Sequence, residues 1–190
     1  MALKFGLIGK NGSGKSTVCQ YLKDKGFTVI SLSDYVREKV KSLGLEPSRD
    51  NLVNTANALK AEKGQTALAE MAYERYVSLG GQDIVFDSIR NIPEIEYLKS
   101  KGVVICGIEA DIEKRFNRIT ERQHGTDNVD LDTFKQHDQR ENSGESSGQQ
   151  INAALALAEI QINNEGNLDA LYEQIDEKLL RVRNGELKNA

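Results

Sequence analysis

The sequence predicts a three-layer α/β fold, in which a five-stranded parallel sheet is flanked by helices. Short apolar segments typical of buried strands alternate with helix-like segments, a pattern that produces parallel strands joined by crossover helices. A glycine-rich loop follows the first apolar segment, where a buried strand should end. A chain of 190 residues can bury one hydrophobic core without disulfides or structural metals, so we predict a single domain.

The first part of the chain predicts two strands and four helices. The last two helices follow each other without a strand between them, the first behind the candidate cap Ser48 and the second closed by a pair of glycines. This succession indicates a helical insertion at about residues 34–81. The predicted strands are 3–8 and 28–32, and the predicted helices are 15–25, 34–43, 49–63 and 66–79.

The second part of the chain returns to alternation and completes the sheet. Polar segments around 123–130 and 142–148 lack the apolar residues needed for a core, so we predict a short lid at about residues 123–148. The core would then comprise residues 1–33, 82–122 and 149–190. The predicted strands are 84–86, 103–108 and 160–163, and the predicted helices are one after Pro93 and those at 111–122, 131–141, 150–158 and 168–182.

The glycine-rich loop at residues 9–16 matches the complete pattern G-x-x-x-x-G-K-[ST] of a phosphate-binding loop, and it predicts the P-loop NTPase fold. Glycines let the backbone curl so that N–H groups face an anion at the positive end of the following helix. Lys15 can reach the terminal phosphates and the hydroxyl of Ser16 can hold Mg2+. The predicted ATP-binding residues of this segment are Gly9, Asn11, Gly12, Ser13, Gly14, Lys15, Ser16 and Thr17.

Two acids stand at predicted strand ends on the same edge of the sheet. Asp87 closes an apolar strand, which is where a phosphate-loop enzyme places the acid that holds Mg2+ directly or through water. A strand-ending aspartate without a metal is the alternative. Asp34 ends the second predicted strand and is a candidate for a second metal-linked acid, a ribose contact or a base for a hydroxyl; as a helix cap it would need no further function.

An arginine follows each of these acids after three residues: Arg37 follows Asp34, and Arg90 follows Asp87. Because the planar guanidinium can bind two phosphate oxygens at once, we predict that both arginines, together with Asp34, bind an acceptor that carries a phosphate. We therefore expect the helical insertion at about residues 34–81 to be the acceptor-binding part of the domain.

A row of further arginines leads into the predicted lid. Arg115, Arg118 and Arg122 lie on one face of a predicted helix, and Arg140 lies beyond the polar segment. For each of them a solvated helix face is the alternative. Because the row runs into a flexible-looking segment, we predict that Arg115, Arg122 and Arg140 act with Lys15 as catalytic groups when the lid closes.

Short motifs resemble those of known kinases. The segments 33–37, Ser-Asp-Tyr-Val-Arg, and 86–93, Phe-Asp-Ser-Ile-Arg-Asn-Ile-Pro, resemble the acceptor-binding motifs of adenylate-kinase-like nucleoside monophosphate kinases. This resemblance implies that the two arginines grip the acceptor phosphate. The segment 158–166 is similar to dephospho-CoA kinases and to archaeal relatives of adenylate kinase, which implies that Asn163 and Gly166 lie beside the adenine of ATP.

Nearly the whole chain resembles the kinase-like domain that precedes the deaminase in some dCMP deaminase fusions. The matching segments are 49–52, 57–60, Gly64 and 148–151. The sequence contains no His-x-Glu together with Pro-Cys-x-x-Cys, so deamination by this chain is excluded.

Composition narrows the partners and the compartment. A net charge of -4 argues against a general nucleic-acid binder, since it offers no broad attraction to a phosphate backbone. The two cysteines, Cys19 and Cys106, stand in apolar settings without metal-ligand spacing, which predicts free thiols in a reducing compartment. No apolar stretch has the length of a membrane span and no signal-peptide pattern is present, so we expect a cytoplasmic protein with a small nucleotide acceptor as its partner.

Three functions agree with these residues. A phosphotransferase acting on a nucleoside or deoxynucleoside monophosphate would use Arg37 and Arg90 to bind the acceptor phosphate and would need no general base. Transfer to a hydroxyl, as on dephospho-CoA, would use Asp34 as the base. A nucleotide sensor without turnover would use the phosphate loop alone.

Overall fold

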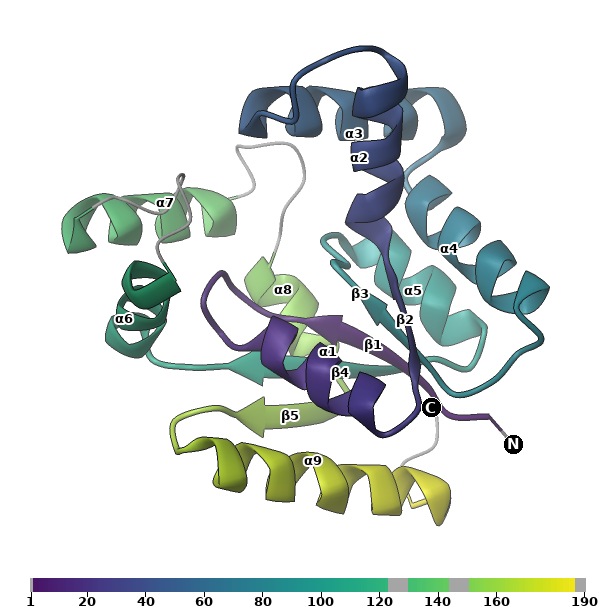
Figure 1. The fold of residues 1–190 in the computed structure, drawn as a ribbon, viewed down its shortest axis with the longest axis vertical. Coiled ribbons are helices and arrows are strands. Elements are labelled where there is room, and N and C mark those ends of the chain that lie inside the picture. The colour runs from purple at the N-terminus through teal and green to yellow at the C-terminus, as the bar shows by residue number, and fades with distance from the viewer. Residues whose placement is uncertain (1, 123–129, 144–150, 187–190) are drawn as a thin grey trace.

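The computed structural model describes residues 2–122, 130–143 and 151–186, and it contains one five-stranded sheet (Figure 1). All neighbouring strands pair in parallel, in the order β2-β3-β1-β4-β5, so the predicted fold class is confirmed. The strands are β1 Lys4–Ile8, β2 Thr28–Ser31, β3 Ile84–Asp87, β4 Val104–Glu109 and β5 Ile160–Asn163. The helices of the described residues are α1 Lys15–Asp24, α2 Leu32–Ser42, α3 Arg49–Lys63, α4 Ala67–Ser78, α5 Ile92–Ser100, α6 Ile112–Arg122, α7 Leu131–Ser143, α8 Ile151–Ala156 and α9 Leu168–Arg183.

Helices cover both faces of the sheet, and each face has its own apolar core. On one face, side chains of α1 and α9 such as Val18 and Ile175 pack against Leu7 of the central strand β1. On the other face, helices α2, α4, α5 and α8 pack around Phe86 of β3. These two clusters make the sheet the middle layer of three.

The inserted helices are not separate from the core. Ala69 and Ala72 of α4 are fully buried in the same cluster as Phe86. Small side chains let this helix approach the sheet closely, whereas α3 lies farther out, where it crosses the upper end of α2 at the top of Figure 1. The predicted insertion therefore packs into the same hydrophobic cluster as the sheet.

Helix α2 begins directly after β2, two residues earlier than predicted. Ser31 has the extended backbone of an N-cap, and Leu32 and Val36 turn into the core one helical turn apart. The prediction that Asp34 ends the second strand is wrong, because this residue lies in the first turn of α2. The burial of Leu32 decides the boundary.

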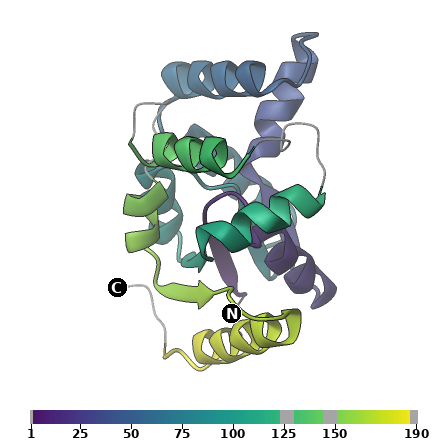
Figure 2. The same cartoon turned by 90° about the vertical axis from the view of Figure 1, so that its left-hand side faces the viewer.

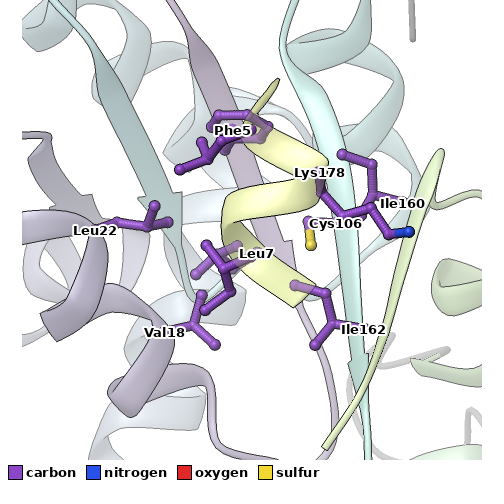
Figure 3. A pocket seen from close by; sticks show the side chains of 10 residues that line it. Phe5, Leu7, Val18, Leu22, Cys106, Ile160, Ile162 and Lys178 are labelled. Atoms are coloured by element: carbon purple, nitrogen blue, oxygen red, sulfur yellow. The ribbon is translucent and has the colours of Figure 1, made fainter. Parts of the chain in front are cut away.

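A small cavity lies in the apolar layer between the sheet and helices α1 and α9 (Figure 3). Its lining is apolar apart from the side chain of Lys178, so it offers no set of groups suited to phosphate. Cys106 lies in this layer, and burial raises the pKa of its thiol to about 12. Both cysteines are free thiols, as predicted.

In the part of the chain that the structure describes, no helix combines the length and the apolar character needed to cross a bilayer.

Candidate nucleotide-binding site

The phosphate loop connects β1 to the start of α1 and is tightly packed from outside. Gly12 and Gly14 have φ angles of 76° and 103°, in the region that favours glycine. A Cβ at Gly12 would lie 2.6 Å from the carbonyl oxygen of Arg115, and a Cβ at Gly14 would lie 2.2 Å from Nδ2 of Asn164. These positions therefore require glycine for both conformation and space.

Lys15 lies at the N-terminus of α1 with its amine folded over the loop. Its Nζ donates to the carbonyl oxygens of Gly9 at 2.5 Å and Lys10 at 3.0 Å. Ser16 follows in the first turn and is exposed, while Thr17 is half-buried behind it. The lysine charge is thus held at the mouth of the loop, where a terminal phosphate of a bound nucleotide would be neutralised.

Asp87 ends β3, and one of its carboxylate oxygens is available to a cation. Oδ2 accepts a hydrogen bond from Oγ of Ser88 at 3.1 Å. Oδ1 is buried and has no hydrogen-bond partner among the described residues. Leaving a buried carboxylate oxygen unpaired costs free energy, so this oxygen fits a Mg2+ ion or a water bound to one. Ser16 and Asp87 would offer Mg2+ the hard oxygen donors that this ion prefers.

Asp87 and Lys15 both influence the thiol of Cys19 in α1. The pKa of the Cys19 thiol is raised to about 12, first by burial and then by the carboxylate of Asp87, while the ammonium of Lys15 opposes the rise. The charges of the loop lysine and of the strand-end acid therefore act on the same thiol, with opposite signs.

Replacing Asp87 with asparagine should remove most of the Mg2+ dependence of nucleotide binding, because the change keeps the shape of the side chain and removes its charge. The measurement is the dissociation constant for ATP with Mg2+ and with EDTA. Asp24→Asn, an exposed change at the far end of α1, is the matched control and should keep the dependence. An unchanged Mg2+ titration in Asp87→Asn would leave Asp87 as a strand terminus only.

Three serine hydroxyls connect Asp87 to the start of α2. Ser88 is joined to Ser31 by a hydrogen bond of 3.0 Å, and Ser31 to Ser33 by one of 2.9 Å. Ser88 has a φ of 64°, an uncommon conformation for a residue with a side chain, which is maintained here at a candidate ligand site. No role for these three serines was predicted from the sequence; their one signal is that hydroxyl residues stand at or beside two strand ends that become neighbours.

Arg37 completes this hydrogen-bonded chain. Its Nη1 donates to Oγ of Ser33 at 2.8 Å and to Oδ1 of Asp34 at 2.7 Å. The Asp34–Arg37 pair is exposed, and exposed pairs contribute only about 0–1 kcal/mol. An incoming phosphate can therefore replace Asp34 as the partner of the Arg37 guanidinium at a small cost in free energy.

Arg90 lies on the neighbouring loop, which a buried network holds in place. Asn91 caps α5 by accepting from the backbone N–H of Glu94 at 2.8 Å, and Oε2 of Glu94 accepts from the backbone N–H of Arg90 at 2.9 Å. Nζ of Lys60 in α3 lies 3.7 Å from the other oxygen of this carboxylate. The insertion is thereby linked to the loop that carries Arg90.

Glu94 should make stability depend on pH. Burial raises the pKa of its carboxyl group, against the opposing effects of Lys60 and of the backbone N–H donors. A raised folded pKa means that the folded protein holds this proton more tightly, so the stabilisation is present below the ordinary pKa near 4.5 and is lost as the pH rises through the folded pKa. Glutamine does not titrate, so the free energy of unfolding of Glu94→Gln, measured with urea, should increase relative to that of the wild type as the pH rises from 4.5 to 7. A constant difference between the two proteins would contradict this.

The α6 arginines turn toward the phosphate loop. Arg115 is 3% exposed, and its two terminal nitrogens donate to both carboxylate oxygens of Asp138 in α7, at 2.7 and 3.0 Å. Its Nη1 also donates to the carbonyl oxygen of Asn11. Arg115 therefore does not lie on a solvated helix face. Its guanidinium is already bonded to Asp138 and to the loop backbone, and its catalytic role stays a prediction.

Helix α7 contributes Asp138, for which no role was predicted from the sequence. Lys10 of the phosphate loop lies 3.6 Å from the same carboxylate. Figure 2 shows α6 and α7 together at the carboxyl end of the strands. Arg122 and Arg140 belong to these helices, but their side chains lie outside the described residues. Of the predicted lid, the structure describes residues 130–143, which include α7, whereas 123–129 and 144–148 lie outside it.

The end of β5 contacts the phosphate loop through Asn164, the neighbour of the predicted Asn163. Asn163 is exposed and its backbone bonds to Gln174, whereas Asn164 is buried and its Nδ2 donates to the carbonyl oxygen of Ser13 at 2.9 Å. Gly166 is exposed in the following turn. The predicted adenine contacts of Asn163 and Gly166 stay predictions.

Among the described residues, no group of three or more histidine, cysteine or acidic side chains is arranged to hold a metal ion. A site with one acid, one serine hydroxyl and ligand phosphates is the arrangement that the residues here can offer to Mg2+.

The fold and this loop define a P-loop domain with a kinase-like architecture. A family model described as an AAA domain matches residues 6–145. The chain belongs to the UPF0200 family: it is 31% identical to a UPF0200 protein from Methanocaldococcus jannaschii over 186 residues, which cover 96% of this chain and 91% of the relative.

Solved structures with the same fold have little sequence in common with this chain. TT1252 from Thermus thermophilus superposes with a TM-score of 0.63 at 20% identity, covering 95% of this chain and 97% of that one. A shikimate kinase from Bacteroides thetaiotaomicron superposes with a TM-score of 0.57 at 12% identity, covering 94% and 98%. The comparisons confirm the P-loop, nucleotide-binding part of the resemblance and the kinase-like fold.

Proposed function

We propose that the protein is an ATP- and Mg2+-dependent phosphotransferase that acts on a nucleoside or deoxynucleoside monophosphate. The observation that carries the proposal is the hydrogen-bonded chain from Asp87 through Ser88, Ser31 and Ser33 to Arg37. It connects the candidate metal ligand beside the phosphate loop to a cation suited to a second phosphate. Donor and acceptor phosphates bound at its two ends would lie on the same edge of the sheet.

The chain's own residues supply positioning and charge. The loop N–H groups and Lys15 would hold the terminal phosphates of ATP, while Arg37 and Arg90 would hold the acceptor phosphate. Mg2+ bound by Ser16 and Asp87 would neutralise charge on the phosphates. An acceptor that is already a phosphate needs no general base, which agrees with an Asp34 that is engaged by Arg37.

Transfer to a hydroxyl is the second candidate, and the exposure of Asp34 favours it. Only one oxygen of this carboxylate accepts from Arg37 in the bonds described above, and the group faces solvent where an acceptor would arrive. Asp34 would then act as the base for the attacking hydroxyl, as on dephospho-CoA. A nucleotide sensor would use the phosphate loop without either acceptor.

An acceptor screen tests these functions together. The protein is incubated with Mg-ATP and a panel of ribo- and deoxyribonucleoside monophosphates and dephospho-CoA, and ADP release is followed. Steady ADP release with a monophosphate is the expected result, and Lys15→Ala is the control for contaminating kinases. Turnover with dephospho-CoA alone would favour the hydroxyl acceptor. Tight ATP binding without turnover on any acceptor would contradict the kinase and favour the sensor.

A further inference from the structure

Three successive carbonyl groups of the phosphate loop are each held from outside by a side chain. Arg115 Nη1 donates to the oxygen of Asn11 at 3.2 Å, and Arg118 Nη1 donates to the oxygen of Gly12 at 3.5 Å. Asn164 Nδ2 donates to the oxygen of Ser13 at 2.9 Å. We call Arg115, Arg118 and Asn164 the carbonyl clamp.

The clamp is a built arrangement rather than a set of surface contacts. Asn164 is 6% exposed and Arg115 is 3% exposed, so turning either side chain to solvent would leave its buried hydrogen-bond partners unsatisfied. Arg118 also donates to the backbone oxygen of Asn164 at 2.8 Å, which ties two clamp residues to each other. Arg115 also donates to the oxygen of Ala110 at 3.1 Å.

Asp138 keeps Arg115 in this position. Its carboxylate binds the guanidinium with two hydrogen bonds, and burying both charges together avoids an unpaired buried cation. Because Asp138 already occupies two nitrogens of Arg115, the guanidinium is directed to the loop backbone. Helix α7 thus supports the clamp from outside.

Holding the carbonyls outward turns the loop N–H groups inward. In a trans peptide the C=O of one residue and the N–H of the next point in opposite directions, and the described chain has no cis peptide. Fixing the oxygens of Asn11 and Ser13 therefore directs the N–H groups of Gly12 and Gly14 to the inner side of the loop. The N–H of Ser13, which shares a peptide with the oxygen that Arg118 binds, is used within the turn, where it donates to the carbonyl oxygen of Lys10 at 3.2 Å. Arg118 therefore contributes by fixing this turn and the backbone of Asn164.

We propose that Arg115, Arg118 and Asn164 are positioning residues that pre-form the phosphate nest and so set the affinity for polyphosphate without contacting the base. The inference rests on the proposed nucleotide binding and deepens it. A nest whose N–H groups already face inward does not have to order its backbone when the anion binds, and this ordering cost would otherwise reduce the affinity.

The test compares a bare polyphosphate with a nucleotide. Isothermal titration calorimetry without Mg2+ measures the affinities of sodium tripolyphosphate and of ATP for the wild type, Arg118→Met and Asn164→Asp. Methionine keeps the apolar stem of Arg118 without its donors, and aspartate keeps the shape of Asn164 but places an acceptor against the oxygen of Ser13. The matched controls are Arg75→Met in α4 and Asn117→Asp on the exposed side of α6.

We expect each clamp variant to lower the affinities for tripolyphosphate and for ATP by the same factor, about 5- to 20-fold. Each control variant should change neither affinity by more than about twofold. Arg118→Lys should recover part of the loss. A fall for ATP alone would overturn the inference, because it would assign Arg118 or Asn164 to the base; so would unchanged affinities in variants with wild-type melting temperatures. If the wild type binds neither probe, the proposed function fails together with the inference, whereas wild-type binding with unaffected variants overturns the inference alone.

Discussion

Replacing Lys15 with alanine should reduce phosphoryl transfer by about 10^2- to 10^4-fold while the protein stays folded. The ammonium lies over the mouth of the loop, where it donates to Gly9 and Lys10. Charge on the terminal phosphates increases toward the transition state, so a cation at this place stabilises the transition state more than the ground state. Lys15 does not belong to either apolar core cluster, so its removal should leave the packing intact.

The measurement is the kcat with the best acceptor found in the screen, with thermal melting as the check on folding. Lys23→Ala, an exposed change in the last turn of α1, is the matched control and should keep the wild-type rate. Near-normal turnover in a folded Lys15→Ala protein would contradict the role of the loop in catalysis.

Replacing Arg37 or Arg90 with alanine should raise the KM for the acceptor by about 10- to 100-fold and leave ATP binding nearly unchanged, since each change removes a charge-assisted contact of roughly 1.5 to 3 kcal/mol. Both residues follow neighbouring strand ends, which are joined in register at Ser31 and Asp87. Lysine at either place should restore only part of the affinity, because it keeps the charge and loses the two-pronged geometry.

The matched control is Lys39→Ala, which removes an exposed cation from the same helix α2. The measured ATP affinity and acceptor KM distinguish transfer to a monophosphate from transfer to a hydroxyl. If ATP affinity falls while the acceptor KM holds, the arginines belong to the donor side, and transfer to a hydroxyl with Asp34 as the base becomes the better explanation.

Most of the sheet could be predicted because its signals are local. The fully apolar segment before Asp87 predicts a buried parallel strand wherever it stands in the chain, and β3 ends at Asp87 as expected. The phosphate loop is likewise defined by its own glycines. The start of α2 could not be predicted in this way, because it depends on the burial of Leu32 against other elements.

The clamp residues could not be recognised from their surroundings in the sequence. Asn163 and Asn164 are identical neighbours at the end of β5, and only the twist of the strand and the approach of the loop decide which one is buried. Arg115 looks like part of a charged helix face until Asp138, 23 residues later, is brought beside it. Each contact joins segments whose separation in the chain carries no periodic signal.

By itself the sequence determined the P-loop class, the parallel sheet and the strand edge at which the polar residues gather, because periodicity and the spacing of glycines act over a few residues. The tertiary structure alone decided which side chains meet there: the bare oxygen of Asp87, the serine chain to Arg37, and the clamp that joins Ser13 to Asn164 across 151 residues. The physical reason is that hydrogen bonds and burial depend on atomic positions within a few tenths of an ångström, which only the packing of all the layers establishes.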